Sequence, residues 1–406
     1  MQDKVVFRRV LAVVLIAVTA AAGTRILPQL NYFFKGKRAT IGWDLDVVCS
    51  ALQALSVGND PYLREAKFPL PYGIIHVYLF EPLCAITTYP FVYGIVFALI
   101  AIGSAVALWR LVPPSPLDRV AVLVAVLFAF NTFHWQLMSG NLAVIELPLI
   151  TAVVLLLADG RYRWAGFVFG VMSSLKLLPF FGVLAFLFLP RPLRVRFETV
   201  AAAIVGLLGV EALNAVLFSR WLPSYAGQLL GRLPGSAGYE AGGYFNQNTI
   251  DFVFDGLQQL GIGQPVSGFV LACLALGVSA LVAVACARKT TEHGELPPVA
   301  VVSLVMLVLW LFIFRQKNYA FETFIPLIIA AGYGAGRATG RAAIMASIIA
   351  TGIFNFGEEK FFIADYYQLL GVWAAVLVVL LGAIIKLRWT PATAQRETIG
   401  VGGSAS

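Results

Sequence analysis

The sequence predicts an all-α membrane protein with many crossings, and three observations carry that prediction. Of its 406 residues, 60% are hydrophobic and only 12% charged, whereas soluble domains carry about 25% charged residues. Apolar runs of roughly 20 residues, each long enough to span a hydrocarbon core, recur along the chain. Lys and Arg lie in short segments between those runs. We therefore expect a single integral-membrane domain over residues 1–406, with roughly 10–12 transmembrane or re-entrant helices and short amphipathic helices in an outer loop.

The cationic residues give the orientation of the predicted helices. The net charge of +8 is spread over the segments between apolar runs, which indicates topology signals and not a nucleic-acid surface. Lys4, Arg8 and Arg9 precede the first apolar segment, so the first helix, about residues 7–27, should run outward from the cytoplasm. No clear small-residue cleavage site follows it, so we expect a retained helix and not a removed signal peptide.

Residues 28–72 are expected to form the first outer loop, which carries the acidic pair Asp44 and Asp46. Over residues 46–57 apolar side chains recur at helical spacing, and a Gly-Asn-Asp-Pro stretch then stops the helix. A short amphipathic helix of this kind can lie flat at the membrane interface. Further helical patterns follow over about 73–111 with interruptions at Pro82 and Pro90, over 119–135, and over 141–158 after a tight outer turn at "HWQLMSGN".

Residues 164–189 form an apolar segment with basic residues on both sides. A single crossing would put one basic cluster outside, against the positive-inside trend. Lys176 and Pro179 lie near its midpoint, and irregular backbone at membrane depth is tolerated only where protein or a wet cavity surrounds it. We therefore predict a broken or re-entrant helix pair. The flanking residues are Arg161, Arg163, Arg191, Arg194 and Arg196.

The remaining helices are expected to alternate outward and inward, with an outer loop over 220–264. They are predicted near 198–218, 266–287, 297–314, 320–336, 341–355 and 367–387.

The four cysteines have no metal-ligand spacing. Cys49 and Cys84 could lie on the same side of the membrane, so a disulfide between them is one alternative. Unpaired thiols are the alternative that the sequence favours.

Asp44 and Asp46 are the first candidates for chemistry, because most of the chain avoids charge. A solvated loop pair, or an N-cap for the helix that follows, explains them without any function. An acid at the bilayer surface beside an apolar helix also suits a general base that acts on a lipid-borne substrate.

Lys176 and Glu146 are ionisable residues inside apolar segments, where such residues are functional candidates. Snorkelling to an interface is the alternative for Lys176, but its mid-segment position favours a role such as pairing with a lipid phosphate. Glu146 either pairs with Lys176 or contacts a substrate, and both interpretations stay open.

Polar residues of the outer side complete the set of candidates. Amides and imidazoles suit sugar hydroxyls, although they equally suit turns and structural contacts. The "RQKNY" stretch is too basic for an ordinary outer turn and could hold a phosphate headgroup. The possible contacts with sugar or acceptor are His76, His134, Asn141, Glu146, Asn246 and Gln247, and the possible phosphate ligands are Lys176, Arg315 and Lys317.

Five stretches between about residues 40 and 255 carry a resemblance to a known family. They are "WDLDVVCSALQALSVGNDPYL", "FPLPYGIIHVYLFEPL", "SGNLAVIEL", "WAGFVFGVMSSLKLLP" and "SYAGQLLGRLPGSAGYEAGGYFNQNTI". In this order they resemble the motifs of membrane glycosyltransferases of the C superfamily, and among these glycosyltransferase family 87, typified by mannosyltransferases that use polyprenol-phosphate-mannose. Asn141 and Asn248 stand where Gln and Ser are usual, and "RQKNYAFE" replaces a Trp-His-type motif before a late helix.

The resemblance implies an activity and a place for it. It implies Asp44 as the catalytic base, with Asp46 as a weaker second acid. The implied reaction transfers a sugar, in the first place a mannose-like hexose, from a polyprenyl-phosphate donor to a lipid or glycan acceptor, with inversion. The enzyme would lie in the bacterial cytoplasmic (inner) membrane with its active site facing the periplasm or cell exterior. A lipid-phosphate leaving group demands no cofactor, while the Asp44-Leu45-Asp46 spacing keeps a divalent metal open.

Two other functions compete with the glycosyltransferase. A transporter or lipid flippase without catalytic activity would also bury charge and break helices, but such folds commonly show paired repeats. An O-antigen ligase or polymerase would need more arginine chemistry on the outer face.

Overall fold

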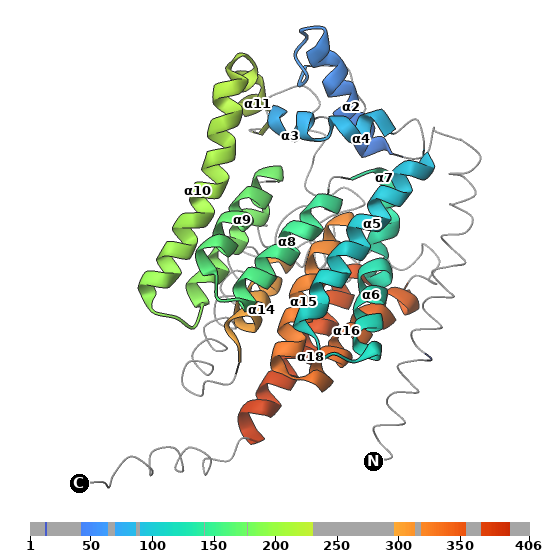
Figure 1. Ribbon diagram of the computed structural model, residues 1–406, viewed down its shortest axis with the longest axis vertical. Coiled ribbons are helices and arrows are strands. Elements are labelled where there is room, and N and C mark those ends of the chain that lie inside the picture. Colours follow the sequence, from blue (N-terminus) through green and yellow to red (C-terminus); the bar gives the residue numbers. More distant parts are fainter. Residues whose placement is uncertain are drawn as a thin grey trace, which may run out of the picture.

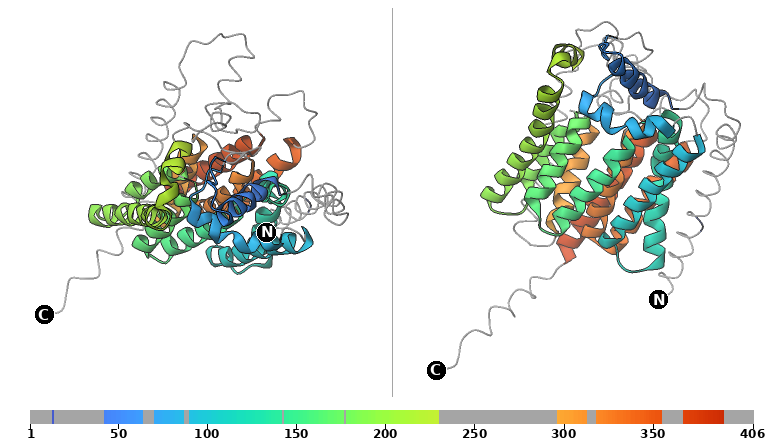
Figure 2. Two further views of the ribbon diagram at one scale, coloured as in Figure 1. Left: turned by 90° about the horizontal axis from the view of Figure 1, so that it is seen from above. Right: turned by 45° about the horizontal axis from the view of Figure 1, so that its top comes forward.

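The described part of the protein is an all-helical bundle. The computed structural model describes Val13 and residues 42–63, 70–86, 90–141, 143–176, 178–229, 296–312, 318–354 and 367–389, and these ranges contain no strand. Figure 1 and the right-hand view of Figure 2 show a body of long helices with a group of shorter helices, α2, α3, α4 and α11, at one end. We call this the capped end. The predicted helices at 7–27 and 266–287 lie outside the described ranges, apart from Val13.

The first half of the bundle follows the predicted order of helices with one correction. The expected turn at "HWQLMSGN" is wrong, because most of it forms a helix of its own, α7. Phe130 has a left-handed backbone with φ 58°, so the chain leaves the direction of α6 and starts again. The helices are α2 (Trp43–Ser56), α3 (Ile74–Leu79), α4 (Glu81–Ile86), α5 (Pro90–Leu108), η2 (Trp109–Leu111), α6 (Pro116–Phe128), η3 (Ala129–Asn131), α7 (Thr132–Ser139) and α8 (Ala143–Ala158).

The next segment turns back on itself at Lys176. Helix α9 (Tyr162–Leu175) ends there because Lys176 is extended, with φ −144° and ψ 121°, and η4 (Leu178–Phe188) follows. The basic flanks lie side by side, since Arg163 contacts Glu198 at 2.8 Å and Arg191 Nε donates to Tyr162 Oη at 2.9 Å. Its placement in a membrane as a re-entrant pair stays a prediction. The chain continues through α10 (Leu193–Leu217), η5 (Ser219–Trp221) and α11 (Leu222–Leu229).

Close packing of α9 on α10 requires glycine. A Cβ atom at Gly170 would collide with the carbonyl oxygen of Ala203. The backbones of α9 and α10 therefore meet without intervening side chains. This contact fixes the position of α9 along α10, and with it the position of Lys176 at the end of α9.

The C-terminal helices fill the centre of the body. Trp310 of α14 packs against Phe169 of α9 and Phe324 of α15, and its indole nitrogen donates to the Pro179 carbonyl at 3.0 Å. These contacts hold the irregular segment after Lys176 against the core. The helices are α14 (Pro298–Leu311), η7 (Asn318–Thr323), α15 (Phe324–Ala335), α16 (Arg337–Phe354) and α18 (Tyr367–Trp389).

Two helices of the described part are long and apolar enough to cross a membrane, Val92–Leu111 and Leu193–Leu217. Five shorter helices are also apolar: Ala143–Ala158, Pro179–Phe188, Pro298–Leu311, Phe321–Ala335 and Leu369–Ala383. The outer face of α10 exposes large apolar side chains, among them Leu208 and Val216. Such an exposed apolar face suits a lipid environment.

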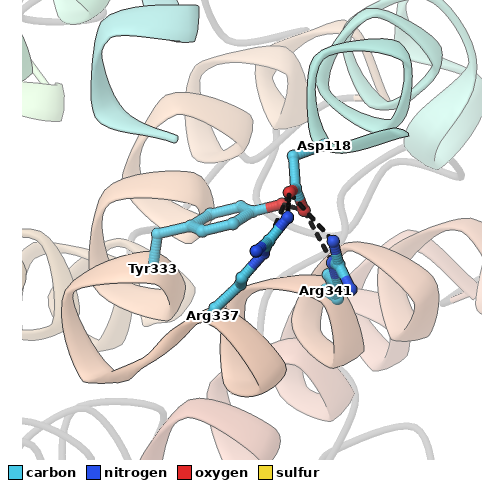
Figure 3. A network of polar contacts seen from close by, with 4 residues as sticks. All are labelled: Asp118, Tyr333, Arg337 and Arg341. Atoms are coloured by element: carbon cyan, nitrogen blue, oxygen red, sulfur yellow. Dashed lines mark hydrogen bonds and ion pairs between the residues drawn. The ribbon is translucent and has the colours of Figure 1, made fainter. Parts of the chain in front are cut away.

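A buried ion cluster joins three helices at the end of the bundle away from α2. The carboxylate of Asp118, in the first turn of α6, is completely buried. It accepts hydrogen bonds from Arg337 and Arg341 of α16 at 2.6–3.1 Å, and from Tyr333 Oη of α15 at 2.9 Å (Figure 3). Because the donors satisfy both carboxylate oxygens, the cluster is a structural clamp.

Replacing Asp118 should destabilise the protein strongly. Asp118→Ala leaves Arg341 without its partner in a buried place, and such a loss typically costs about 3–5 kcal/mol. Asp159→Ala is the matched control, because the Arg110–Asp159 pair is exposed and such pairs contribute about 0–1 kcal/mol. Thermal unfolding of both variants in detergent measures the difference, and equal midpoints would contradict the clamp.

Candidate functional site

Helix α2 carries Asp44 to the junction between the capped end and the body. The helix starts at Trp43 after Gly42, whose φ of 80° suits glycine, and Asp44 lies in its first turn. The inward face of α2 packs on a small apolar core that includes Val48, Ala51 and Phe80. That packing leaves Asp44 half-buried and faces it towards the turn between α7 and α8. Asp44 Oδ2 accepts a hydrogen bond from Asn141 Nδ2 at 2.8 Å.

The turn that presents Asn141 depends on Gly140. Gly140 has a φ of +69°, and a Cβ atom there would lie 2.9 Å from the Leu45 Cβ atom on α2. Asn141 is fixed on both sides, because its backbone N–H donates to Ser139 Oγ at 3.1 Å and its Oδ1 accepts from the Ala143 N–H at 2.9 Å. The amide therefore caps the start of α8 and turns its NH₂ group towards Asp44.

Lys176 and Glu146 meet at the same place from two other elements. Lys176 Nζ lies 2.9 Å from Glu146 Oε1, and it donates to Asn141 Oδ1 at 3.3 Å. The Glu146 side chain is 5% exposed and that of Lys176 is 24% exposed, so the pair lies inside the protein. Asp44, Asn141, Lys176 and Glu146 thus form one chain of contacts, which we call the polar chain. It connects four residues that the sequence singled out separately, and it pairs Glu146 with Lys176.

His76 lies nearby but is not a cation. Its Nε2 atom is 3.1 Å from Ser174 Oγ, two residues before Lys176. Burial lowers the pKa of His76 from 6.5 to about 4, because the apolar surroundings disfavour the charged imidazolium. At neutral pH its neutral ring suits a hydroxyl group better than a phosphate.

The described structure does not place the other predicted site residues next to the polar chain. Asp46 lies on the exposed side of α2, so the two acids of the pair face different surroundings. His134 belongs to α7, but its side chain is outside the description. Arg315, Lys317, Asn246 and Gln247 also lie outside the described residues.

Besides Asp118, sequence reasoning missed a buried acid that lies close to this site, Glu322 of η7. Its side chain is fully buried, neither carboxylate oxygen has a hydrogen-bond partner among the described residues, and it interacts electrostatically with Glu146. The signal that singled out Glu146 was present here too, since Glu322 is an acid inside an apolar run. Within the described ranges, no three His, Cys, Asp or Glu side chains are grouped so that they could hold a metal ion.

A disulfide ties the Asp44 helix to the capped end, contrary to the alternative that the sequence favoured. Cys49 of α2 and Cys84 of α4 are bonded, with Cα atoms 5.5 Å apart. The sequence raised this pairing as the less favoured alternative, because the 35 residues between the two cysteines give no sign that they meet. Disulfides persist in oxidising compartments, so the bond favours a capped end that faces the periplasm or the cell exterior.

Apolar helices around a buried polar chain indicate a helical membrane protein with a candidate site near one end of its bundle. The sequence profile of Glycosyltransferase family 87 matches residues 70–313, more than half of the chain, and the chain belongs to this family of glycosyltransferases. The family resemblance is thereby confirmed. Comparison with curated proteins gave no match. The matched range contains Asn141, Glu146 and Lys176, whereas Asp44 lies before it.

The disulfide should be necessary for full stability. Replacing Cys49 and Cys84 by Ser should lower the free energy of unfolding by about 3–4 kcal/mol, because the bond closes a loop of intermediate length. In a background with Cys273→Ser and Cys286→Ser, a maleimide should label the denatured protein only after reduction. Labelling of both thiols without a reductant would contradict the bond.

Gly140→Ala should disturb the site with little change elsewhere. The added methyl group would lie against Leu45 and would also need an unfavourable left-handed backbone. We expect α2 to shift away from Asn141 and transferase activity to fall at least tenfold, as misplacement of about 1 Å can do. Gly94→Ala is the control, since a Cβ atom there would meet nothing within 4 Å. Equal activities of the two variants would count against this geometry.

Proposed function

We propose that the protein is a multi-pass membrane glycosyltransferase that takes its sugar from a polyprenyl-phosphate donor and acts at the outer face of the membrane. The acceptor is a lipid or glycan, and Asp44 is the general base. The observation that carries this proposal is the 2.8 Å contact between Asp44 and Asn141. It joins an acid of the capped end to a turn within the range that matches the family.

Asp44 can perform the proton transfer that the reaction needs. The acceptor hydroxyl oxygen attacks the anomeric carbon, its proton passes to the Asp44 carboxylate, and the bond between that carbon and the phosphate oxygen breaks. The electron pair of the broken bond leaves with the lipid phosphate. Attack opposite the leaving group inverts the anomeric centre. A general base of this kind typically contributes about 10²–10⁴-fold to the rate.

Cationic side chains would stabilise the leaving phosphate. Arg315 and Lys317 directly precede η7 in the sequence and fit this role by their chemistry. Lys176 is the third candidate from the sequence. The leaving lipid phosphate carries less charge than a nucleoside diphosphate, so a divalent metal is not demanded. Asp44 and Asp46 face different surroundings, which disfavours a metal held between them.

The sugar would be bound by neutral polar groups. The proposed contacts are His76, His134, Asn141, Asn246 and Gln247, whereas Glu146 is the ion-pair partner of Lys176. A mannose-like hexose is the proposed sugar. The neutral ring of His76 suits this assignment because it can accept or donate a hydrogen bond to a hydroxyl group.

The charge distribution supports an outer location for Asp44. The end of the bundle away from α2 carries many arginines, which favour the cytoplasmic side. They include Arg110, Arg163, Arg194, Arg337 and Arg341. The capped end carries the Cys49–Cys84 bond, which suits the periplasm or cell exterior. We therefore place the protein in a bacterial cytoplasmic membrane with the capped end outside.

Asp44→Asn tests the proposal. With purified protein and a panel of polyprenyl-phosphate sugars, the substitution should lower kcat by about 10²–10⁴-fold, because the amide cannot take the proton. The overall fold should remain, as checked by the thermal midpoint. Glu81→Gln is the matched control, since Glu81 is an exposed acid of the same end. Turnover by Asp44→Asn at the rate of the control would refute the base assignment.

A further inference from the structure

The charge of Lys176 is already balanced inside the protein. Its ammonium lies 2.9 Å from Glu146 Oε1, and the Glu146 side chain is only 5% exposed. A lysine that served chiefly as a phosphate ligand would have to leave this partner, and an ionised Glu146 would then stay buried without compensation, which is costly.

Lys176 is also held by the backbone around it. It lies where α9 ends, and the direct backbone contact of α9 with α10 at Gly170 fixes that end. The Trp310 indole binds the Pro179 carbonyl just beyond it. A side chain placed by rigid elements on both sides is suited to positioning a neighbour.

Asn141 connects this ion pair to Asp44. The Asn141 Oδ1 atom accepts from Lys176 Nζ and from the Ala143 N–H, so two donors hold the amide in the orientation that points Nδ2 at Asp44. If Lys176 were neutral, the buried Glu146 carboxylate would attract that NH₂ group for itself. The ion pair therefore keeps the amide available to Asp44.

We propose that Lys176 is a positioning residue which, together with Glu146, fixes the Asn141 amide and so holds the Asp44 carboxylate in one orientation. This inference rests on the proposed function, because it takes Asp44 as the base. It removes Lys176 from the phosphate ligands and leaves that role to other cations of the chain.

A set of three variants separates this role from phosphate binding. In Lys176→Met, kcat should fall at least tenfold while KM for the polyprenyl-phosphate donor stays within about twofold, the pattern expected when orientation and not donor binding is lost. Adding Glu146→Gln to Lys176→Met should recover most of the lost kcat, because no unpaired acid then competes for Asn141. Lys176→Arg, which keeps the cation, should retain more activity than Lys176→Met.

The opposite outcome is equally well defined. A phosphate ligand would give a donor KM raised at least tenfold in Lys176→Met and in the double variant alike, with no recovery, and this would overturn the proposal. The double variant carries the test even where Lys176→Met does not fold, since it contains no unpaired charge. Failure of the proposed function can be told apart from failure of this inference. An Asp44→Asn variant with full activity would show that Asp44 is not the base, whatever the Lys176 variants do.

Discussion

Charge inside an apolar helical bundle must be compensated, and this constraint determines where the polar residues of the protein lie. A buried ion without a partner costs several kcal/mol, whereas a well-placed pair can be tolerated. The protein meets this constraint in two ways. Asp118 is surrounded by two arginines and a tyrosine, and both of its carboxylate oxygens accept hydrogen bonds from them. Neither oxygen is therefore available to a substrate. Lys176 and Glu146 are paired too, but their contacts continue through Asn141 to a carboxylate that is half-buried.

The difference between these two clusters separates a structural element from a candidate site. In the Asp118 cluster the acid is the inaccessible centre. In the polar chain the acid at the end, Asp44, lies on a short helix outside the body and is held there by a turn, a small apolar core and a disulfide. A base at such a boundary is oriented by ordered polar groups on its inner side, which suits a group that must meet a substrate in a fixed position.

Much of the helix order could be predicted from the sequence because hydrophobic length and period carry it. The breaks at Pro82 and Pro90, the end of α9 near Lys176 and most later helices follow from apolar runs interrupted by proline or charge. The stretch "HWQLMSGN" is predicted as a turn because its polar residues and glycine are typical of turns, but most of it belongs to helix α7. The left-handed Phe130 that separates α6 from α7 gives no signal in the sequence, since phenylalanine rarely adopts that backbone.

The sequence by itself determined the composition-driven features: apolar helices, a charge-poor interior, the few ionisable residues that stand out within it, and the motifs of the family. Each of those residues could be found because an ionisable group in an apolar run is rare. Only the tertiary structure decided which of them meet. Asp44, Asn141 and Lys176 are far apart along the chain, and the pairing of Cys49 with Cys84 likewise depends on how α2 packs against α4. Such contacts result from close packing between helices, which depends on single glycines and on the whole core at once, and no local pattern encodes that.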